Sequence, residues 1–390
     1  MDFCLEVALF CDHAGFAVVT FGDQHFNNYE PYCSPFTMIA ALAGHMERSY
    51  LGTTVIPLLD YHPFRFAEYC NIVDIMTRGR CLLGTSAGSQ PQLLKNFGMP
   101  AGSGNLDVFN QKLDVVLKAW AHEPSDPPLE FETPQDRGWL PTRIMPTSYR
   151  NPHPLMAIGT NSDHNIIAAA KRGWPVYLGR YRLEESAHKM KVYRDALLAA
   201  DHSEARSAEC LKMSSVTKTV LVAETDEKAW ALAEQRLRPA MDFLFSYGSR
   251  TGREDVPDVE PDTRSMRAMW EDTKTTGNLD TIGTGAFGPA DWVQCEVLVG
   301  SVETVVKELE KYRAAGVEHL NVRFLFGPLD PPEIMRNLEL FAKEVMPTMG
   351  SETLPGPLPE HIREEHRTAP KVPTPYLDRI QAARRLPSFR

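Results

Sequence analysis

The chain has 390 residues, of which 43% are hydrophobic and 24% are charged, and its formal net charge at pH 7 is −10. Without a basic run, this acidic balance argues against nucleic acid or an anionic membrane surface as a partner. No apolar stretch reaches the roughly 20 residues of a membrane-spanning helix, and no basic segment with an apolar core opens the chain, so we expect a cytoplasmic globular protein.

Apolar runs and glycines predict helices and strands that alternate along the chain. The first helix ends at Gly15 and leads into a strand. Seven strands are predicted in all, at residues 17–21, 50–59, 81–86, 155–160, 175–179, 214–223 and 319–326. Further helices are predicted at residues 63–79, 106–121, 162–173, 183–200, 226–245, 301–315 and 331–345.

This alternation predicts an α/β fold with a parallel sheet and right-handed crossovers. Seven strands fit a (β/α)₈ TIM barrel that lacks its first strand better than an open doubly wound sheet, because no G-x-G-x-x-G motif follows any strand. We expect one domain at 1–349, with long insertions at 123–153 and 247–294 that act as functional loops. The tail at 350–390 is rich in proline and charge, which predicts an extended or disordered segment.

The cysteines and carboxylates give no sign of a disulfide framework or a metal centre. The seven cysteines are scattered and odd in number, and they form no C-x-x-C pair. This pattern predicts buried free thiols. The strand ends lack the group of carboxylates that a Mg²⁺ or two-metal centre needs, so no metal site is expected.

Polar side chains gather where the predicted strands end, which is where barrel enzymes carry their chemistry. They are Asp23, Gln24 and His25, then Thr53, Thr54, Asp60 and His62, then Ser86 and Gly88, and finally Gly159, Thr160, Asn161 and Ser162. His25 can exchange protons near neutral pH, and its place beside Asp23 favours an acid/base role over a histidine that is hydrogen-bonded in a loop.

The helix after the second strand is interpreted from its start and its charges. His62 precedes a proline at the helix start and is interpreted as a turn and cap residue. Arg65, Glu68 and Asp74 are interpreted as a salt-linked face of this helix.

The stretch "GTNSDHN", residues 159–165, has two interpretations. Asn161 or Ser162 can cap the next helix, and the backbone N–H groups beside such a cap suit a phosphate. An ordinary N-cap needs no ligand, so both interpretations stay open on these residues alone.

Three stretches, read in order, resemble the bacterial luciferase-like, flavin-dependent monooxygenase family. They are "FGDQHF" at 21–26, the segment from "SPFTMIAALAGHMERSYLGTT" to "GRCLLGTSAG" at 34–88, and "GVEHLNVRFLFGPLDPPEIMRNLELFAKEVMP" at 316–347. The resemblance spans residues 5–348 and rests on this combination rather than on one motif. It implies a (β/α)₈ barrel that binds reduced FMN or, in one branch, the deazaflavin F420 at its C-terminal face.

The resemblance also implies roles for particular residues. The flavin ring would lie over Thr53, Thr54 and Val55, where relatives often carry a non-prolyl cis peptide. The catalytic group would be His25 with Gln24 and Asp23. The implied cofactor-binding residues are Thr53, Thr54, Ser86, Gly88, Thr160, Asn161 and Ser162.

Three positions depart from the family pattern. Gln24 stands where luciferase-type members have the first of two histidines, and glutamine cannot carry a proton at neutral pH. Ala87 replaces the arginine that clamps the flavin phosphate, so backbone N–H groups at 160–163 or a distant cation such as Arg182 would have to meet that charge. The F420 branch usually has an aspartate directly before its histidine, which "DQH" does not.

By this resemblance we expect a monooxygenase in which reduced FMN and O₂ oxygenate a small organic substrate, with a separate NAD(P)H:flavin reductase as its partner. A homodimer is implied, and the insertion at 247–294, with Trp270, Phe287 and Trp292, would form a lid. The alternatives are an F420-dependent oxidoreductase and a flavin-binding relative without catalysis.

Overall fold

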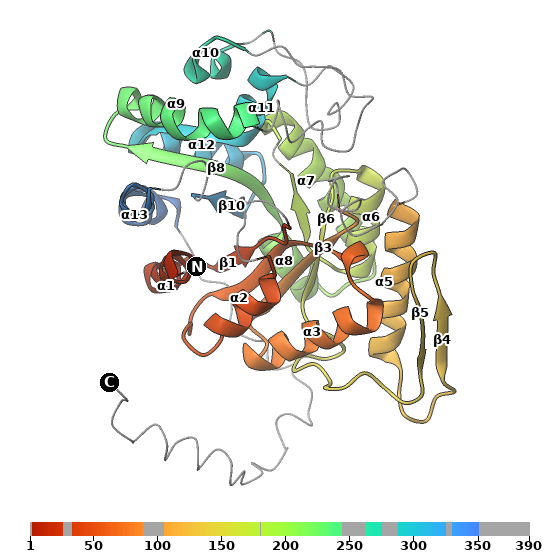
Figure 1. Cartoon of the computed structure of the whole chain (residues 1–390). Helices are drawn as coiled ribbons and strands as arrows, with labels where there is room; N and C mark the ends of the chain where they lie inside the picture. The colour runs from red at the N-terminus through yellow and green to blue at the C-terminus, as the bar shows by residue number, and fades with distance from the viewer. Residues whose placement is uncertain are drawn as a thin grey trace, which may run out of the picture.

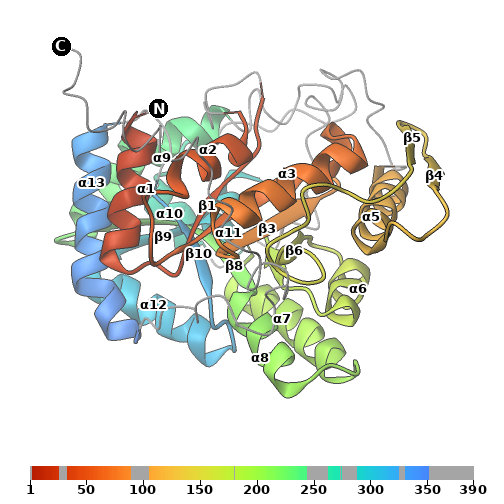
Figure 2. The same cartoon turned by 90° about the horizontal axis from the view of Figure 1, so that it is seen from below.

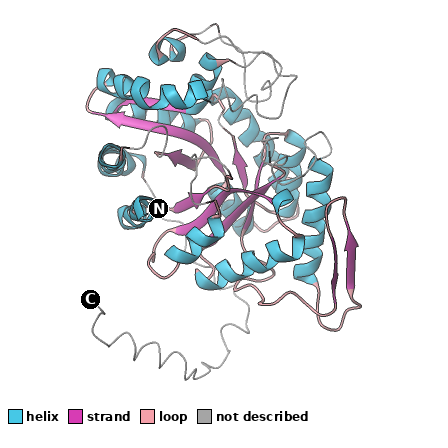
Figure 3. Cartoon of the chain, in the orientation of Figure 1, coloured by secondary structure: helices cyan, strands magenta, loops and turns pink. Residues whose placement is uncertain are grey.

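The computed structural model describes residues 2–25, 33–88, 105–179, 181–243, 262–272, 274, 288–324 and 330–350. Figure 1 shows a central sheet surrounded by helices, and Figure 3 separates the strands from the helices by colour. Residues 351–390, which contain nearly all of the expected tail, lie outside the described residues.

The central sheet consists of parallel strands in barrel order. Its main path is β1 (Val18–Phe21), β2 (Tyr50–Pro57), β3 (Cys81–Ser86), β6 (Met156–Gly159), β7 (Val176–Leu178), β8 (Ser215–Ala223) and β10 (Leu320–Arg323). Short apolar runs form these strands because helices cover the outside of the sheet and side chains fill its inside. All seven predicted strands are present, and the predicted α/β barrel class is confirmed.

An additional strand, β9 (Val297–Ser301), was not predicted. It pairs in parallel with the C-terminal half of β8, from Thr219 to Ala223, whereas β10 pairs with the N-terminal half of β8. The sequence "VLVGS" runs directly into the next helix without a separate turn, so no local signal separates it from that helix. β9 extends the sheet beyond the seven-strand path.

Aromatic side chains join the two ends of the sheet. In the described part of the chain β1 and β10 are the end strands of the main path, and the first strand of a closed barrel would lie between them. The ring of Phe16, before β1, lies 6.3 Å from that of Phe324 and 6.2 Å from that of Phe341. Figures 1 and 2 show α1 (Asp2–Ala14) and α13 (Pro331–Leu340) side by side outside these strands.

Most of the other helices surround the sheet, as Figure 2 shows from below. They are α2 (Pro35–Leu42), α3 (Pro63–Met76), α5 (Asn105–Ala121), α6 (Asp163–Arg172), α7 (Leu183–Leu198), α8 (Glu204–Met213), α9 (Asp226–Phe243), α10 (Met266–Trp270), α11 (Pro289–Glu296) and α12 (Val302–Ala314). Several start at a serine whose hydroxyl accepts the N–H three residues later, namely Ser162, Ser203, Ser265 and Ser301. None of the described helices is long and apolar enough to cross a membrane.

The first insertion contains a hairpin rather than a loop alone. β4 (Leu129–Glu132) and β5 (Arg137–Leu140) pair in antiparallel fashion beside α5. Asp136 in the hairpin turn lies 2.9 Å from Lys112 Nζ of α5, and the ring of Phe131 lies 5.0 Å from that of Phe64. These contacts attach the hairpin to the barrel.

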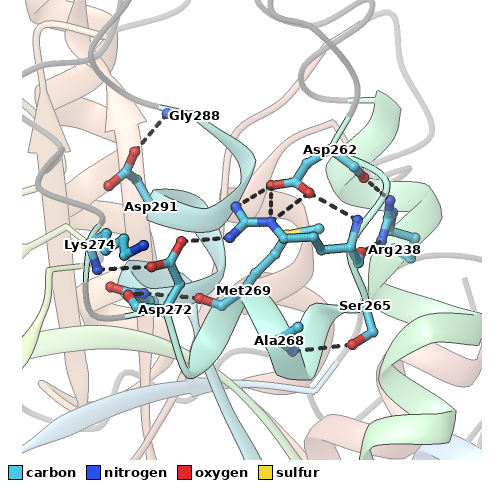
Figure 4. A network of polar contacts seen from close by, with 11 residues as sticks. Arg238, Asp262, Ser265, Ala268, Met269, Asp272, Lys274, Gly288 and Asp291 are labelled. Carbon is cyan, nitrogen blue, oxygen red and sulfur yellow. Dashed lines mark hydrogen bonds and ion pairs between the residues drawn. The ribbon is translucent and has the colours of Figure 1, made fainter.

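The described part of the second insertion is held together by polar contacts (Figure 4). Arg264 forms ion pairs of 2.5 Å with Asp262 and with Asp272. Gln294 of α11 donates to the carbonyl oxygens of Met269, at 2.9 Å, and Asp272, at 2.6 Å. The network connects α10 to α11 although they are far apart in the sequence.

Two of the three aromatic residues expected in a lid pack inside this part of the protein. Trp292 is 7% exposed in a core formed with side chains of β8 and β9. The ring of Trp270 lies 6.2 Å from that of Trp230 on α9. Phe287, the third, lies outside the described residues.

The charges of α3 are only partly as predicted. His62 caps the helix by accepting the N–H two residues later, so its interpretation as a cap residue is confirmed. Arg65 pairs with Glu68 at 2.7 Å, which confirms that part of the ionic face. The expectation for Asp74 was wrong. Its side chain is fully buried and accepts a hydrogen bond of 2.7 Å from the backbone N–H of Arg150.

All seven cysteines are free thiols, as predicted. Five of them are buried, Cys4 is half-buried and Cys33 is exposed, so the expectation of burial was wrong for Cys33.

Candidate active site

The predicted site residues lie at one end of the sheet. The strands β1, β2, β3, β6 and β7 are parallel neighbours, so their C-terminal ends meet at the same edge. Polar side chains stand at or near the ends of β1, β2, β3 and β6, as the sequence predicts.

At the end of β1, His25 Nε2 lies 2.8 Å from Asp23 Oδ1. Tyr61, which follows the short helix η1 (Leu58–Asp60), donates its hydroxyl to Asp23 Oδ2 at 2.7 Å. Asp23 is fully buried, and burial raises its pKa, while its contacts with Tyr61 and His25 lower it. Gln24, between Asp23 and His25 in the sequence, is half-buried. Asp23 therefore orients the imidazole.

The end of β2 contains the cis peptide bond that the family resemblance implies. This bond joins Thr54 and Val55. The Thr54 hydroxyl donates to the hydroxyl of Thr20 on β1 at 3.0 Å. Val55 packs over Gly159 of β6, where a Cβ atom would lie 2.7 Å from Val55 Cγ1. Glycine at 159 therefore gives this cis segment the room it needs.

Two other predicted cofactor residues use their hydroxyls locally. Thr53 is fully buried, and its hydroxyl donates to the Gly84 carbonyl oxygen at 2.8 Å within the sheet. Ser86 is half-buried at the end of β3 and accepts the N–H of Gly88 at 3.1 Å. Gly88 has a φ of 76°, a conformation that favours glycine. Ser86 and Gly88 therefore lie at the C-terminal end of β3, at the edge of the site. The hydroxyl of Thr53 instead links β2 to β3.

The start of α6 is a complete N-cap. Ser162 accepts the N–H of Asn165 at 3.3 Å, and Thr160 Oγ1 accepts the N–H of Ser162 at 3.3 Å. Asn161 Oδ1 accepts the N–H of Gly179, after β7, at 3.1 Å. The ordinary N-cap that the sequence left open is therefore present, and a phosphate site here stays a prediction.

A lysine that the sequence did not reveal stands beside this helix start. Lys189 Nζ of α7 lies 2.9 Å from the Asn161 carbonyl oxygen and 3.0 Å from Asp163 Oδ1, and it lies 5.6 Å from the ring centroid of Tyr181. Its side chain is 9% exposed. A single lysine inside a helix carries no sequence signal, because its position depends on how α7 packs against α6.

Arg182, which the sequence suggested as a cation for the flavin phosphate, pairs with residues of α11. Its guanidinium lies 2.7 Å from Asp291 Oδ1 and donates to Gln294 Oε1 at 2.9 Å, so it attaches α11 to the loop after β7. Lys189 is thus the better-placed cation for an anion at α6.

The site offers a half-buried imidazole paired with a buried carboxyl group, hydroxyl groups, and a helix start with an adjacent lysine. Within the described ranges, no three His, Cys, Asp or Glu side chains form a group that could hold a metal ion. Hydroxyls and an imidazole suit a polar ring system with both donors and acceptors, and the helix start with its lysine suits an anion. An organic cofactor with a ring and a phosphate fits this set.

Comparison with known proteins gives a match over most of the chain. A family model described as luciferase-like monooxygenase matches residues 2–319. This range includes every site residue named above.

Characterised relatives are similar at low identity. The alkanal monooxygenase alpha chain of the Kryptophanaron alfredi symbiont is 22% identical over 344 residues, which cover 86% of this chain and 89% of that protein. Limonene 1,2-monooxygenase of Rhodococcus erythropolis is 25% identical over 270 residues, which cover 66% of this chain and 64% of that protein.

Solved structures share the fold. The monooxygenase RslO1 from Streptomyces bottropensis superposes with a TM-score of 0.67 at 22% identity, covering 89% of this chain and 92% of that one. The oxygenating constituent of 3,6-diketocamphane monooxygenase from Pseudomonas putida, in complex with FMN, gives 0.64 at 20% identity with the same coverage. The F420-dependent tetrahydromethanopterin reductase of Methanopyrus kandleri gives 0.60 at 17% identity, covering 89% and 95%.

Proposed function

Because the chain belongs to the luciferase-like monooxygenase family, we propose that it is an FMN-dependent monooxygenase that uses reduced FMN and O₂ to oxygenate a small organic substrate. A separate NAD(P)H:flavin reductase would supply the reduced flavin, and the protein would act as a homodimer in the cytoplasm. The FMN complex of the diketocamphane monooxygenase component supports the choice of cofactor. The names of two relatives suggest limonene and alkanals as the first probe substrates.

The observation that carries this proposal is the arrangement of neighbouring strand ends. The His25–Asp23 pair follows β1, and the cis peptide between Thr54 and Val55 lies in β2. The half-buried hydroxyl of Ser86 ends β3. These groups come from adjacent parallel strands, so they face a common end of the barrel.

The residues at these strand ends fit a flavin ring. Thr54 and Ser86 would hold it through their hydroxyls, and His25 would hold a proton at Nε2 against Asp23. When bound, reduced FMN would supply the electrons that activate O₂. The protein's part is to orient the ring, exclude water and exchange the proton.

The start of α6 fits the flavin phosphate only with the help of Lys189. Ser162 caps this helix, whose N-terminal end is electropositive, but Asp163 in its first turn repels an anion. Lys189 offsets that carboxylate at 3.0 Å. This lysine would take the place of the arginine that Ala87 replaces.

Cofactor titration tests the proposed function. The purified chain is titrated with FMN, reduced FMN and F420, and binding is followed by fluorescence quenching. We expect binding of reduced FMN, and oxygenated limonene or alkanal when NADH, a flavin reductase and O₂ are supplied. A chain that binds none of the three cofactors contradicts the proposal.

An F420-dependent oxidoreductase is the second candidate, because F420-dependent enzymes are among the structural neighbours. It would transfer a hydride and consume no O₂. Binding of F420 with reduction of a substrate under anaerobic conditions would replace the first proposal by this one.

A Lys189→Met variant should weaken FMN binding about tenfold or more, because a charge-assisted contact to the phosphate is lost. Riboflavin lacks the phosphate, so its affinity should stay unchanged. Lys191→Met is the matched control, since Lys191 is 70% exposed and pairs with Asp195. Equal losses for FMN and riboflavin would show that the phosphate does not lie at α6.

A further inference from the structure

The hydroxyl of Tyr61 is a group near the strand ends to which the proposed function gives no role. It donates to Asp23 Oδ2 at 2.7 Å, while the other oxygen of this carboxyl group, Oδ1, lies 2.8 Å from His25 Nε2. In the described part of the chain, Oδ1 accepts no hydrogen bond from any other group. One carboxyl group thus connects Tyr61 to His25, with one oxygen facing each neighbour.

The surroundings of Asp23 make the hydroxyl of Tyr61 important. The side chain of Asp23 is fully buried, and a buried carboxylate is unfavourable unless donors replace its lost hydration. Burial raises the pKa of Asp23, and the hydrogen bond from Tyr61 is the foremost of the contacts that lower it, ahead of those from His25. The hydroxyl therefore fixes one oxygen of the carboxyl group and favours its ionised form.

The ring of Tyr61 is held by two helices. Tyr61 follows η1, in which Leu58 and Leu59 are fully buried, and its N–H donates to the carbonyl oxygen of Leu58 at 3.1 Å. Its ring lies 5.9 Å from that of Phe36 on α2 and 6.1 Å from that of Phe66 on α3. Packing against α2 and α3 therefore sets the position of the hydroxyl, independently of the chain that follows β1.

We propose that Tyr61 is a positioning residue that acts on His25 through Asp23. Its hydroxyl holds Oδ2, so the carboxyl group cannot rotate freely and Oδ1 stays directed at Nε2 of the imidazole. An acceptor that is fixed at Nε2 keeps a proton on that nitrogen and gives the ring one defined orientation in the site. The catalytic use of this orientation rests on the proposed function, but the orientation itself does not.

NMR of the full chain without flavin tests this orientation. With ¹⁵N in the histidine rings, a proton on Nε2 gives a ¹H–¹⁵N signal only if it exchanges slowly with water. The signal of His25 is identified by its absence in His25→Asn. We expect the signal in the wild-type chain and its loss in both Tyr61→Phe and Asp23→Asn.

Tyr69→Phe is the matched control and should keep the His25 signal. The ring of Tyr69 belongs to the same aromatic group, 6.4 Å from that of Tyr61, but its hydroxyl accepts from Arg65 Nη2 at 2.8 Å. Both substitutions remove one hydroxyl and keep the ring, so a general loss of packing would affect both variants alike. An unchanged His25 signal in Tyr61→Phe overturns the proposal, and so does a wild-type chain that lacks this signal.

Kinetics test the use of the orientation in the reaction. In Tyr61→Phe, kcat should fall about tenfold or more, because a small misplacement of a catalytic group is costly, while KM and FMN affinity should stay close to those of the wild-type chain. In an Asp23→Asn background the same substitution should change kcat by less than about twofold, since no carboxylate remains to be held. Equal losses in both backgrounds contradict the proposal.

The two readouts separate this inference from the proposed function. A chain without monooxygenase activity can still lose the His25 signal in Tyr61→Phe alone, which would contradict only the proposed function. An active monooxygenase whose His25 signal survives Tyr61→Phe would contradict only the role of Tyr61.

Discussion

Replacing His25 by asparagine should slow formation of the oxygenated product by about 10²–10⁴-fold, the usual contribution of a general acid/base. Asparagine keeps a polar group beside Asp23 but cannot exchange a proton near neutral pH. Gln24, half-buried next to it, has the same limitation and cannot replace it. The rate is measured as product formed per minute with NADH, FMN, a flavin reductase and the probe substrate that the wild-type chain accepts.

The loss must be separated from a loss of folding or of flavin. His13→Asn is the matched control, because His13 is exposed at the end of α1 and lies outside the site. FMN affinity and the thermal unfolding midpoint of His25→Asn should stay close to those of the wild-type chain. A variant that forms product at the wild-type rate would remove His25 from the mechanism.

The fold was predictable because its signals are local. A short apolar run ended by glycine or polar residues marks each strand of the main path, and helices separate these strands. β9 was not predicted, because no turn separates its five residues from α12 and they resemble the beginning of that helix. α2 and α8 were missed for a similar reason, since helices of 8 and 10 residues between other elements contain few turns of periodic pattern.

The site was only partly predictable, because its contacts are long-range. His25 and Asp23 are neighbours in the sequence, so their pairing could be expected. Tyr61 reaches Asp23 from 38 residues away, and Lys189 reaches Asn161 from 28 residues away. Such contacts depend on the packing of whole elements, and no pattern of neighbouring residue types reports them. The cis peptide at Thr54 was expected from the family resemblance alone.

The expectation for Asp74 failed because its partner lies far along the chain. Spacing on α3 places Asp74 near other charges, which suggests an exposed ionic face. The structure instead buries it at the N-terminal end of the barrel strands, beside Cys81 and Arg150. In barrel enzymes that end serves stability rather than chemistry.

An Asp74→Ala variant should therefore lower the free energy of unfolding by about 1–3 kcal/mol, measured by urea denaturation. The substitution leaves the backbone N–H of Arg150 without its 2.7 Å acceptor and removes the carboxylate near its guanidinium. That guanidinium is fixed by the carbonyl oxygen of Gly79 at 2.6 Å and the hydroxyl of Tyr50 at 3.2 Å, and Arg150 is 2% exposed. The Arg150 guanidinium therefore cannot rotate toward water, and solvation does not compensate for the missing Asp74 carboxyl group.

The conservative variant and pH distinguish a lost hydrogen bond from a lost charge. Burial raises the pKa of Asp74 above its unfolded value, so the part of its contribution to stability that depends on protonation is largest at acid pH and is lost as the pH rises through the folded-state pKa. Asp74→Asn keeps an acceptor for Arg150 and does not titrate, so its deficit against the wild-type chain should be smaller than that of Asp74→Ala and should narrow as the pH rises. Asp114→Ala, at an exposed acid, should cost less than about 0.5 kcal/mol. An equal cost for Asp74→Ala and Asp114→Ala would show that the buried contacts of Asp74 do not stabilise the fold.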